Sequence, residues 1–142
     1  MEKQSSLVKQ LAQLNPLIGR WTFKGSFKDN PDKGEGWETY EVINDGSAIL
    51  CDSETRTILS GSIIDIYKHS MKIVFNKDKK KIMGDNDWIL SVVKGTFLLQ
   101  NNMYRFTGKI VESKGTITGK WENKSTSGKW KYWYDKVLTK TA

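Results

Sequence analysis

Residues 19–28 of the 142-residue chain read GRWTFKGSFK, and their alternation indicates the class of fold. Apolar residues and a glycine stand at alternate positions of this stretch, and polar residues stand between them. One set is Trp21, Phe23, Gly25 and Phe27, and the other is Thr22, Lys24, Ser26 and Lys28. Because successive side chains of a strand point to opposite faces, this period of two predicts a half-buried β-strand.

A short α-helix is predicted before this strand, over residues 5–15. Ser5 or Ser6 can cap its first turn, and Asn15-Pro16 can end it. Its apolar face, at helical spacing, consists of Leu7, Val8, Leu11 and Leu14. A helix this short needs packing to be stable, so we expect it to cover an open end of the β-structure.

After the first strand, short apolar runs alternate with polar turns to the end of the chain. Asp45-Gly46 is the sharpest hairpin signal, because this dipeptide accepts the backbone of a tight turn. Further turns are predicted at residues 60–62, 68–70, 100–102 and 113–115. About eight to ten strands joined in this way predict an all-β, antiparallel up-and-down barrel. The barrel spans residues 19–140 of one domain, residues 1–142.

Composition narrows the classes of partner. The net charge is +7, but it comes mostly from lysines spread over turns and outward strand positions, so a nucleic-acid face is not expected. Cys51 is the single cysteine, which excludes an internal disulfide. The sequence contains no apolar run that could span a bilayer. It also lacks a signal-peptide pattern, so we expect a cytoplasmic location.

Three segments together resemble lipocalin-like (calycin) β-barrels, and in particular an uncharacterised bacterial lipocalin-like domain. They are Leu17-Ile18-Gly19-Arg20-Trp21, Asp45-Gly46 and Trp133-Tyr134. The resemblance implies that Gly19 allows close backbone approach and that Trp21 plugs one end of the barrel. It also implies that a basic residue of the last strand crosses over this tryptophan. Lys136 and Lys140 are the candidates, and Lys136 shares a predicted strand face with Trp130 and Tyr134.

Alternation further predicts which side chains line the barrel interior. The expected ligand-binding residues are Tyr40, Arg56, Phe106, Trp130 and Tyr132. The four aromatic residues belong to predicted inward faces, and Arg56 could bind a carboxylate or phosphate. Gly108 and Gly119 are expected to leave space beside them.

No catalytic or cofactor-binding pattern is present. His69 is the single histidine and falls in a predicted exposed turn, and no metal-binding spacing or G-x-S-x-G motif occurs. We therefore expect no metal, no cofactor and no catalytic residue. The predicted function is non-catalytic binding of a small, largely apolar molecule. The alternatives are a basic nucleic-acid or protein interaction module, for which Lys77 and residues 79–81 form a basic hairpin tip, and a small enzyme that uses polar groups of the cavity.

Overall fold

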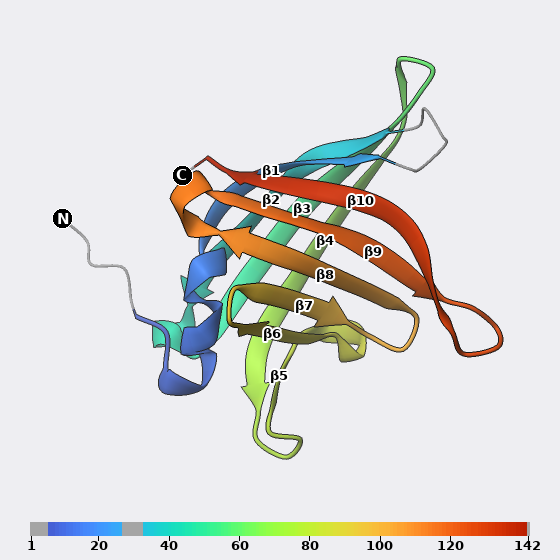
Figure 1. The fold of residues 1–142 in the computed structure, drawn as a ribbon. Helices are drawn as coiled ribbons and strands as arrows, with labels where there is room; N and C mark the ends of the chain where they lie inside the picture. Colours follow the sequence, from blue (N-terminus) through green and yellow to red (C-terminus); the bar gives the residue numbers. More distant parts are fainter. Residues whose placement is uncertain (1–5, 27–32, 142) are drawn as a thin grey trace.

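The computed structural model describes residues 6–26 and 33–141, and these residues form a closed barrel of ten antiparallel strands (Figure 1). Each strand pairs with the next along the chain, and the first strand pairs with the last. The strands are β1 (Gly19–Ser26), β2 (Lys33–Ile43), β3 (Ala48–Leu59), β4 (Ser62–Asn76), β5 (Lys81–Met83), β6 (Ile89–Val93), β7 (Thr96–Gln100), β8 (Tyr104–Val111), β9 (Thr116–Lys124) and β10 (Trp130–Lys140). This arrangement confirms the predicted up-and-down barrel.

The helix before β1 differs from the prediction in type and in position. It is a 3-10 helix, η1 (Lys9–Leu17), rather than an α-helix over residues 5–15, and Pro16 lies inside it. Its buried residues are Leu11, Leu14 and Leu17. Because a 3-10 helix has three residues per turn, this spacing places all three leucines on one face. Ser6 makes no capping hydrogen bond to η1, and Ser5 lies outside the described residues.

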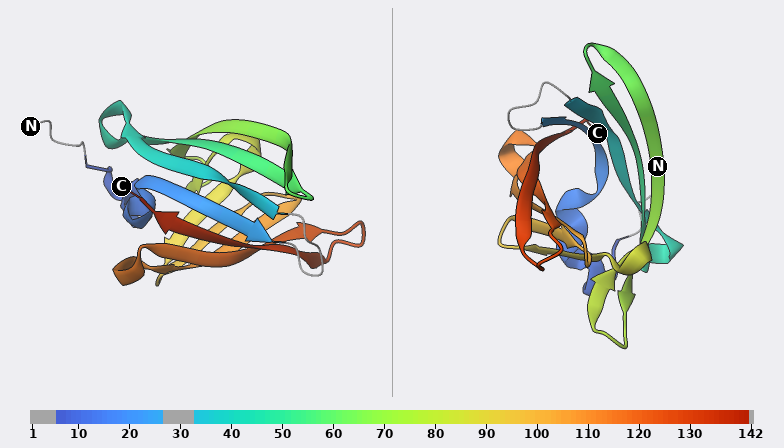
Figure 2. Two further views of the ribbon diagram at one scale, coloured as in Figure 1. Left: turned by 90° about the horizontal axis from the view of Figure 1, so that it is seen from above. Right: turned by 90° about the vertical axis from the view of Figure 1, so that its right-hand side faces the viewer.

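The helix η1 covers one end of the barrel, where β10 also ends (Figure 2), and Trp21 packs against η1 there. The Trp21 indole Nε1 donates a hydrogen bond to the Leu17 carbonyl at 2.9 Å, and the side chain is 1% exposed. The Lys140 amine lies 5.6 Å from the centre of the Trp21 ring. The structure therefore gives Lys140, and not Lys136, the position over the tryptophan.

The half of the barrel next to η1 is packed with apolar side chains. Its core includes Ile49, Ile73, Leu90, Phe97, Phe106, Ile117 and Leu138. Gly108 and Gly119 are opposite each other on β8 and β9. A Cβ added to Gly108 would lie 2.7 Å from the Phe106 ring, and one added to Gly119 would lie 2.2 Å from the Thr107 carbonyl. These glycines allow close packing under Phe106 and do not leave the space that the sequence suggested.

The predicted turn at residues 68–70 is wrong, because β4 runs through it without interruption. Tyr67, His69 and Met71 face Thr55, Ser53 and Cys51 on β3. No glycine or proline breaks this alternation, so the segment extends as a strand. His69 is consequently a half-buried strand residue and not an exposed turn residue.

A β-bulge in β10 reverses the predicted orientation of its first residues. Tyr132 pairs with Glu122, whereas Tyr134 pairs with Trp121, so Trp133 is one extra residue. An extra residue shifts the alternation by one position. Trp130 and Tyr132 therefore lie on the outer surface with Glu122, and the prediction that they line the interior is wrong.

Candidate functional site

A cavity of about 360 Å³ occupies the half of the barrel away from η1. It reaches from buried residues near the middle of the barrel to exposed residues at its rim. The lining residues are Glu38, Tyr40, Cys51, Ser53, Thr55, Tyr67, His69, Met71, Asn86, Trp88, Leu99, Asn101, Tyr104, Trp121 and Lys136. Polar and apolar groups thus share one interior space.

The floor of the cavity holds an ion pair. The Lys136 amine on β10 donates to the Glu38 carboxylate on β2, and both side chains are about nine-tenths buried. The Tyr40 hydroxyl donates to the other oxygen of Glu38 at 3.1 Å. Lys136 pairs with Gly25 of β1, and its amine lies 4.1 Å from the centre of the Phe23 ring. The charges offset each other, so the floor is polar without a net charge.

Burial changes the acidity of the groups around this pair. Desolvation and the nearby groups Cys51 and Glu38 raise the pKa of Tyr40 well above its ordinary value. Desolvation, with the charge of Glu38, raises the pKa of the Cys51 thiol to about 12. Burial likewise raises the pKa of Tyr134. At neutral pH these three side chains are therefore uncharged.

Aromatic rings form the wall opposite β2 and β3. Trp121 contacts Trp88 edge-on, with 6.0 Å between ring centres, and Phe106 at 5.4 Å. Trp121 Nε1 is buried and has no hydrogen-bond partner among the described residues. A buried donor without a partner costs stability. An acceptor group of a ligand that bound this N–H would remove that cost.

The rim of the cavity carries His69 and Tyr67 from β4. Their rings stack with centres 6.1 Å apart and an angle of 15° between planes. Asn86 and Asn101 contribute amide groups from the segments before β6 and after β7. The entrance thus offers hydrogen-bonding groups and flat surfaces.

The five predicted ligand-binding residues are divided between the interior and the exterior. Tyr40 lines the cavity, and Phe106 packs below it against Trp121. Trp130 lies outside, 4.4 Å from the Arg105 guanidinium, and Tyr132 is 41% exposed on the same outer side. Trp130 and Tyr132 therefore do not reach the cavity.

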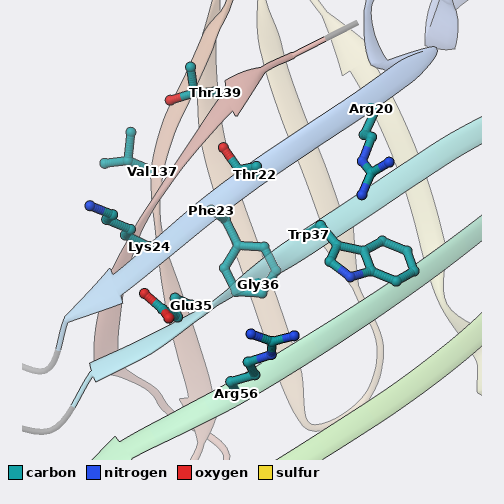
Figure 3. A pocket seen from close by; sticks show the side chains of 10 residues that line it. All are labelled: Arg20, Thr22, Phe23, Lys24, Glu35, Gly36, Trp37, Arg56, Val137 and Thr139. Carbon is teal, nitrogen blue, oxygen red and sulfur yellow. The ribbon is translucent and has the colours of Figure 1, made fainter. Parts of the chain in front are cut away.

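Arg56 also lies outside the barrel. It pairs with Glu54, with 3.0 Å between Nη2 and the carboxylate oxygen. The residue lines a groove of about 470 Å³ on the outer face of β1 to β3, together with Arg20 and Trp37 (Figure 3). The expectation that Arg56 binds a ligand inside the barrel is therefore wrong.

Sequence reasoning missed several lining residues that the structure brings together. Glu38 shares a strand face with Tyr40, and Lys136 shares one with Leu138, so each places a charge on an apolar face. Two opposite charges on inward faces were the available signal for a buried pair. Trp88 begins an apolar run and Trp121 alternates with polar residues, and neither pattern separates these tryptophans from the packed core.

Across residues 6–26 and 33–141, no group of three or more His, Cys, Asp or Glu side chains is placed to hold a metal ion. In the same part of the chain, none of the helices has the length and apolarity needed to cross a membrane.

No protein-family model and no curated protein matches the sequence. Solved structures do match. Rv2717c from M. tuberculosis aligns over 96% of this chain and 100% of its own, with 11% identity and a TM-score of 0.60. The S-type phycobiliprotein lyase CPES from Guillardia theta aligns over 91% and 90%, with 11% identity and a TM-score of 0.61.

A third match is a protein of unknown function from the DUF3598 family of Nostoc punctiforme. It aligns over 96% of this chain and 50% of its own length, with 12% identity and a TM-score of 0.59. At these identities the likeness concerns the fold. The chain is a closed, ten-stranded antiparallel barrel whose fold is similar to that of these three structures.

Proposed function

We propose that this chain binds one small molecule, without chemical conversion, in the interior cavity. The observation that carries the proposal is the division of the barrel into a packed half and a hollow half. The volume of about 360 Å³ lies in the range of small-molecule sites. Barrels of about this size are filled by side chains or hold a single small ligand.

The lining indicates the chemistry of the ligand. Trp88, Trp121, Met71 and Leu99 offer apolar surface, which favours a flat, largely apolar body. The Trp121 N–H and the Glu38–Lys136 pair border the same cavity, and they would bind and orient a polar group of the ligand. A conjugated or aromatic molecule that carries at least one hydrogen-bond acceptor fits both features.

The acid–base state of the floor supports binding rather than catalysis. A cysteine reacts as its thiolate, and the raised pKa of about 12 keeps Cys51 protonated at neutral pH. The Lys136 amine is engaged by Glu38, and burial keeps Tyr40 protonated. None of these groups is poised to act as a nucleophile or base.

Titration with Nile red, an uncharged fluorescent aromatic molecule that carries a carbonyl acceptor, tests the proposal. We expect saturable binding of one probe per chain that added salt barely changes. Thr55→Phe places a ring in the cavity and should weaken binding at least tenfold. Thr39→Phe is the matched control, because Thr39 lies on the outer face of β2, opposite Asp52. Absence of saturable binding, or equal binding by both variants, would refute the proposal.

A further inference from the structure

One edge of β4 lacks a neighbouring strand over most of its length. Among the described residues, β5 pairs only with Val74, Phe75 and Asn76, whereas β3 pairs with β4 from Ser62 to Val74. In a two-stranded ribbon, alternate backbone N–H and C=O groups of each strand point away from the partner. Residues 62–73 therefore present unpaired backbone groups along one edge.

The same segment exposes large apolar side chains. The β3–β4 hairpin projects from one end of the barrel (Figure 1). Ile63, Ile64, Ile66 and Tyr67 are each more than half exposed, at 53%, 58%, 53% and 58%. Exposed edges of soluble proteins are usually blunted by prolines, charges or bulges, because an apolar edge recruits further strands. Here residues 62–70 hold no proline, and the bulge at Ile64 lies near the hairpin tip.

We propose that the β4 edge, residues 62–70, pairs with the β4 edge of a second copy of this chain. The two strands would run antiparallel about a two-fold axis, so that each copy offers the same surface to the other. Backbone hydrogen bonds would then join the two sheets, and the isoleucines would be covered by their counterparts. This proposal does not depend on ligand binding in the cavity.

The charges along the β4 edge permit a second copy to pair there and give no attraction to an anionic or cationic partner. The whole chain carries +7, so two copies repel each other over most of their surface. Residues 62–70 contain one acid, Asp65, and one base, Lys68, besides His69. This edge is therefore neutral, and two copies can meet along it without opposing like charges. A neutral edge offers no electrostatic attraction to an acidic peptide or an anionic membrane.

Sedimentation velocity of the full chain over the micromolar range tests the pairing. We expect a concentration-dependent dimer for the unmodified protein and a monomer for the double variant Ile63→Lys, Ile66→Lys. Val93→Lys combined with Met103→Lys is the matched control, since both residues are also more than half exposed but lie away from β4. Near-ultraviolet circular dichroism checks that each variant stays folded.

Cysteine cross-linking separates strand pairing from general stickiness. Cys51 is buried, so a single cysteine introduced in turn at positions 64, 66 and 68 is the reactive thiol in each variant. Antiparallel pairing about a two-fold axis brings only positions near that axis next to their own copy, so one position should cross-link far faster than the others. A monomer at all concentrations, a dimer that survives the lysine pair, or equal cross-linking at all three positions would overturn the proposal. Self-association seen only on added vesicles or peptides would do the same.

Discussion

Lys136 of β10 and Glu38 of β2 form a buried ion pair although they are 98 residues apart in the sequence. The closure of the barrel makes this contact, because β1 pairs with both β2 and β10. Lys136 lies beside Gly25, which has no side chain, and its amine reaches over the Phe23 ring toward Glu38. The pair thus links β2 to β10 across β1 at the floor of the cavity.

Removing one partner of this pair should destabilise the protein strongly. We expect Lys136→Met to lower the free energy of unfolding by about 3–5 kcal/mol, because Glu38 is then buried without its counter-charge. The double variant Glu38→Gln, Lys136→Met should lose less than the sum of the two single changes. Chemical denaturation measures all three variants. Arg56→Gln is the control and should cost about 1 kcal/mol or less, because the Arg56 side chain is 44% exposed and Glu54 keeps Lys68 at 4.0 Å. Additive losses would show that the pair is not coupled.

Trp21 should be the most sensitive of the tryptophans to truncation. Trp21→Ala removes a fully buried ring and its hydrogen bond to Leu17, so we expect a loss of about 3–5 kcal/mol in thermal or chemical unfolding. Trp130→Ala serves as the comparison, because this ring lies on the outer surface between Arg105 and Lys124. A similar loss for both variants would contradict the role of Trp21 as the plug.

The parts of the fold that follow from local pattern were predictable. The alternation at residues 19–26 predicts β1, and the helical segment before it predicts a cap at one end of the barrel. Each signal comes from residues close together in the sequence, so neither depends on the register of distant strands. The helix type was not predictable from the α-helical template, because Leu11, Leu14 and Leu17 also fit a repeat of three.

The parts of the site that depend on register were not predictable. One extra residue at Trp133 turns Trp130 and Tyr132 outward, and no composition signal marks a bulge of this kind. The Glu38–Lys136 contact needs the closed barrel before either charge meets its partner. Aromatic residues of the cavity wall and of the packed half have the same pattern, so the sequence does not separate them.

Gly119 should tolerate no side chain. An added Cβ would lie 2.2 Å from the Thr107 carbonyl and 2.6 Å from the Cα of Gly108, and both atoms belong to the backbone. We expect Gly119→Ala to cost about 1–3 kcal/mol, the usual range for an overpacked interior. In Gly34→Ala the new Cβ meets no described atom within 4 Å, so this control should change stability little. Equal melting temperatures for the two variants would contradict the close approach of β8 and β9.

Cys51 should make the protein less stable as the pH becomes alkaline. In the unfolded chain its thiol ionises near its ordinary pKa of about 8.5, whereas in the folded chain the pKa is raised to about 12. Between these values the unfolded state has released a proton that the folded state retains, so the contribution to stability is complete below the unfolded pKa and declines as the pH rises.

Cys51→Ala removes this contribution. Its melting temperature should therefore fall less steeply than that of the unmodified protein from about pH 8 to about pH 10, even though the variant starts lower because packing is lost. Tyr134 acts in the same direction in both proteins. Desolvation is the largest cause of the raised pKa of Tyr40 and Cys51 is a smaller one, so Tyr40 stays protonated in the folded state of both proteins over this range and the difference between the slopes keeps its sign. Differential scanning calorimetry across this range measures both curves, and parallel curves would show that the Cys51 thiol ionises equally in the folded and unfolded states.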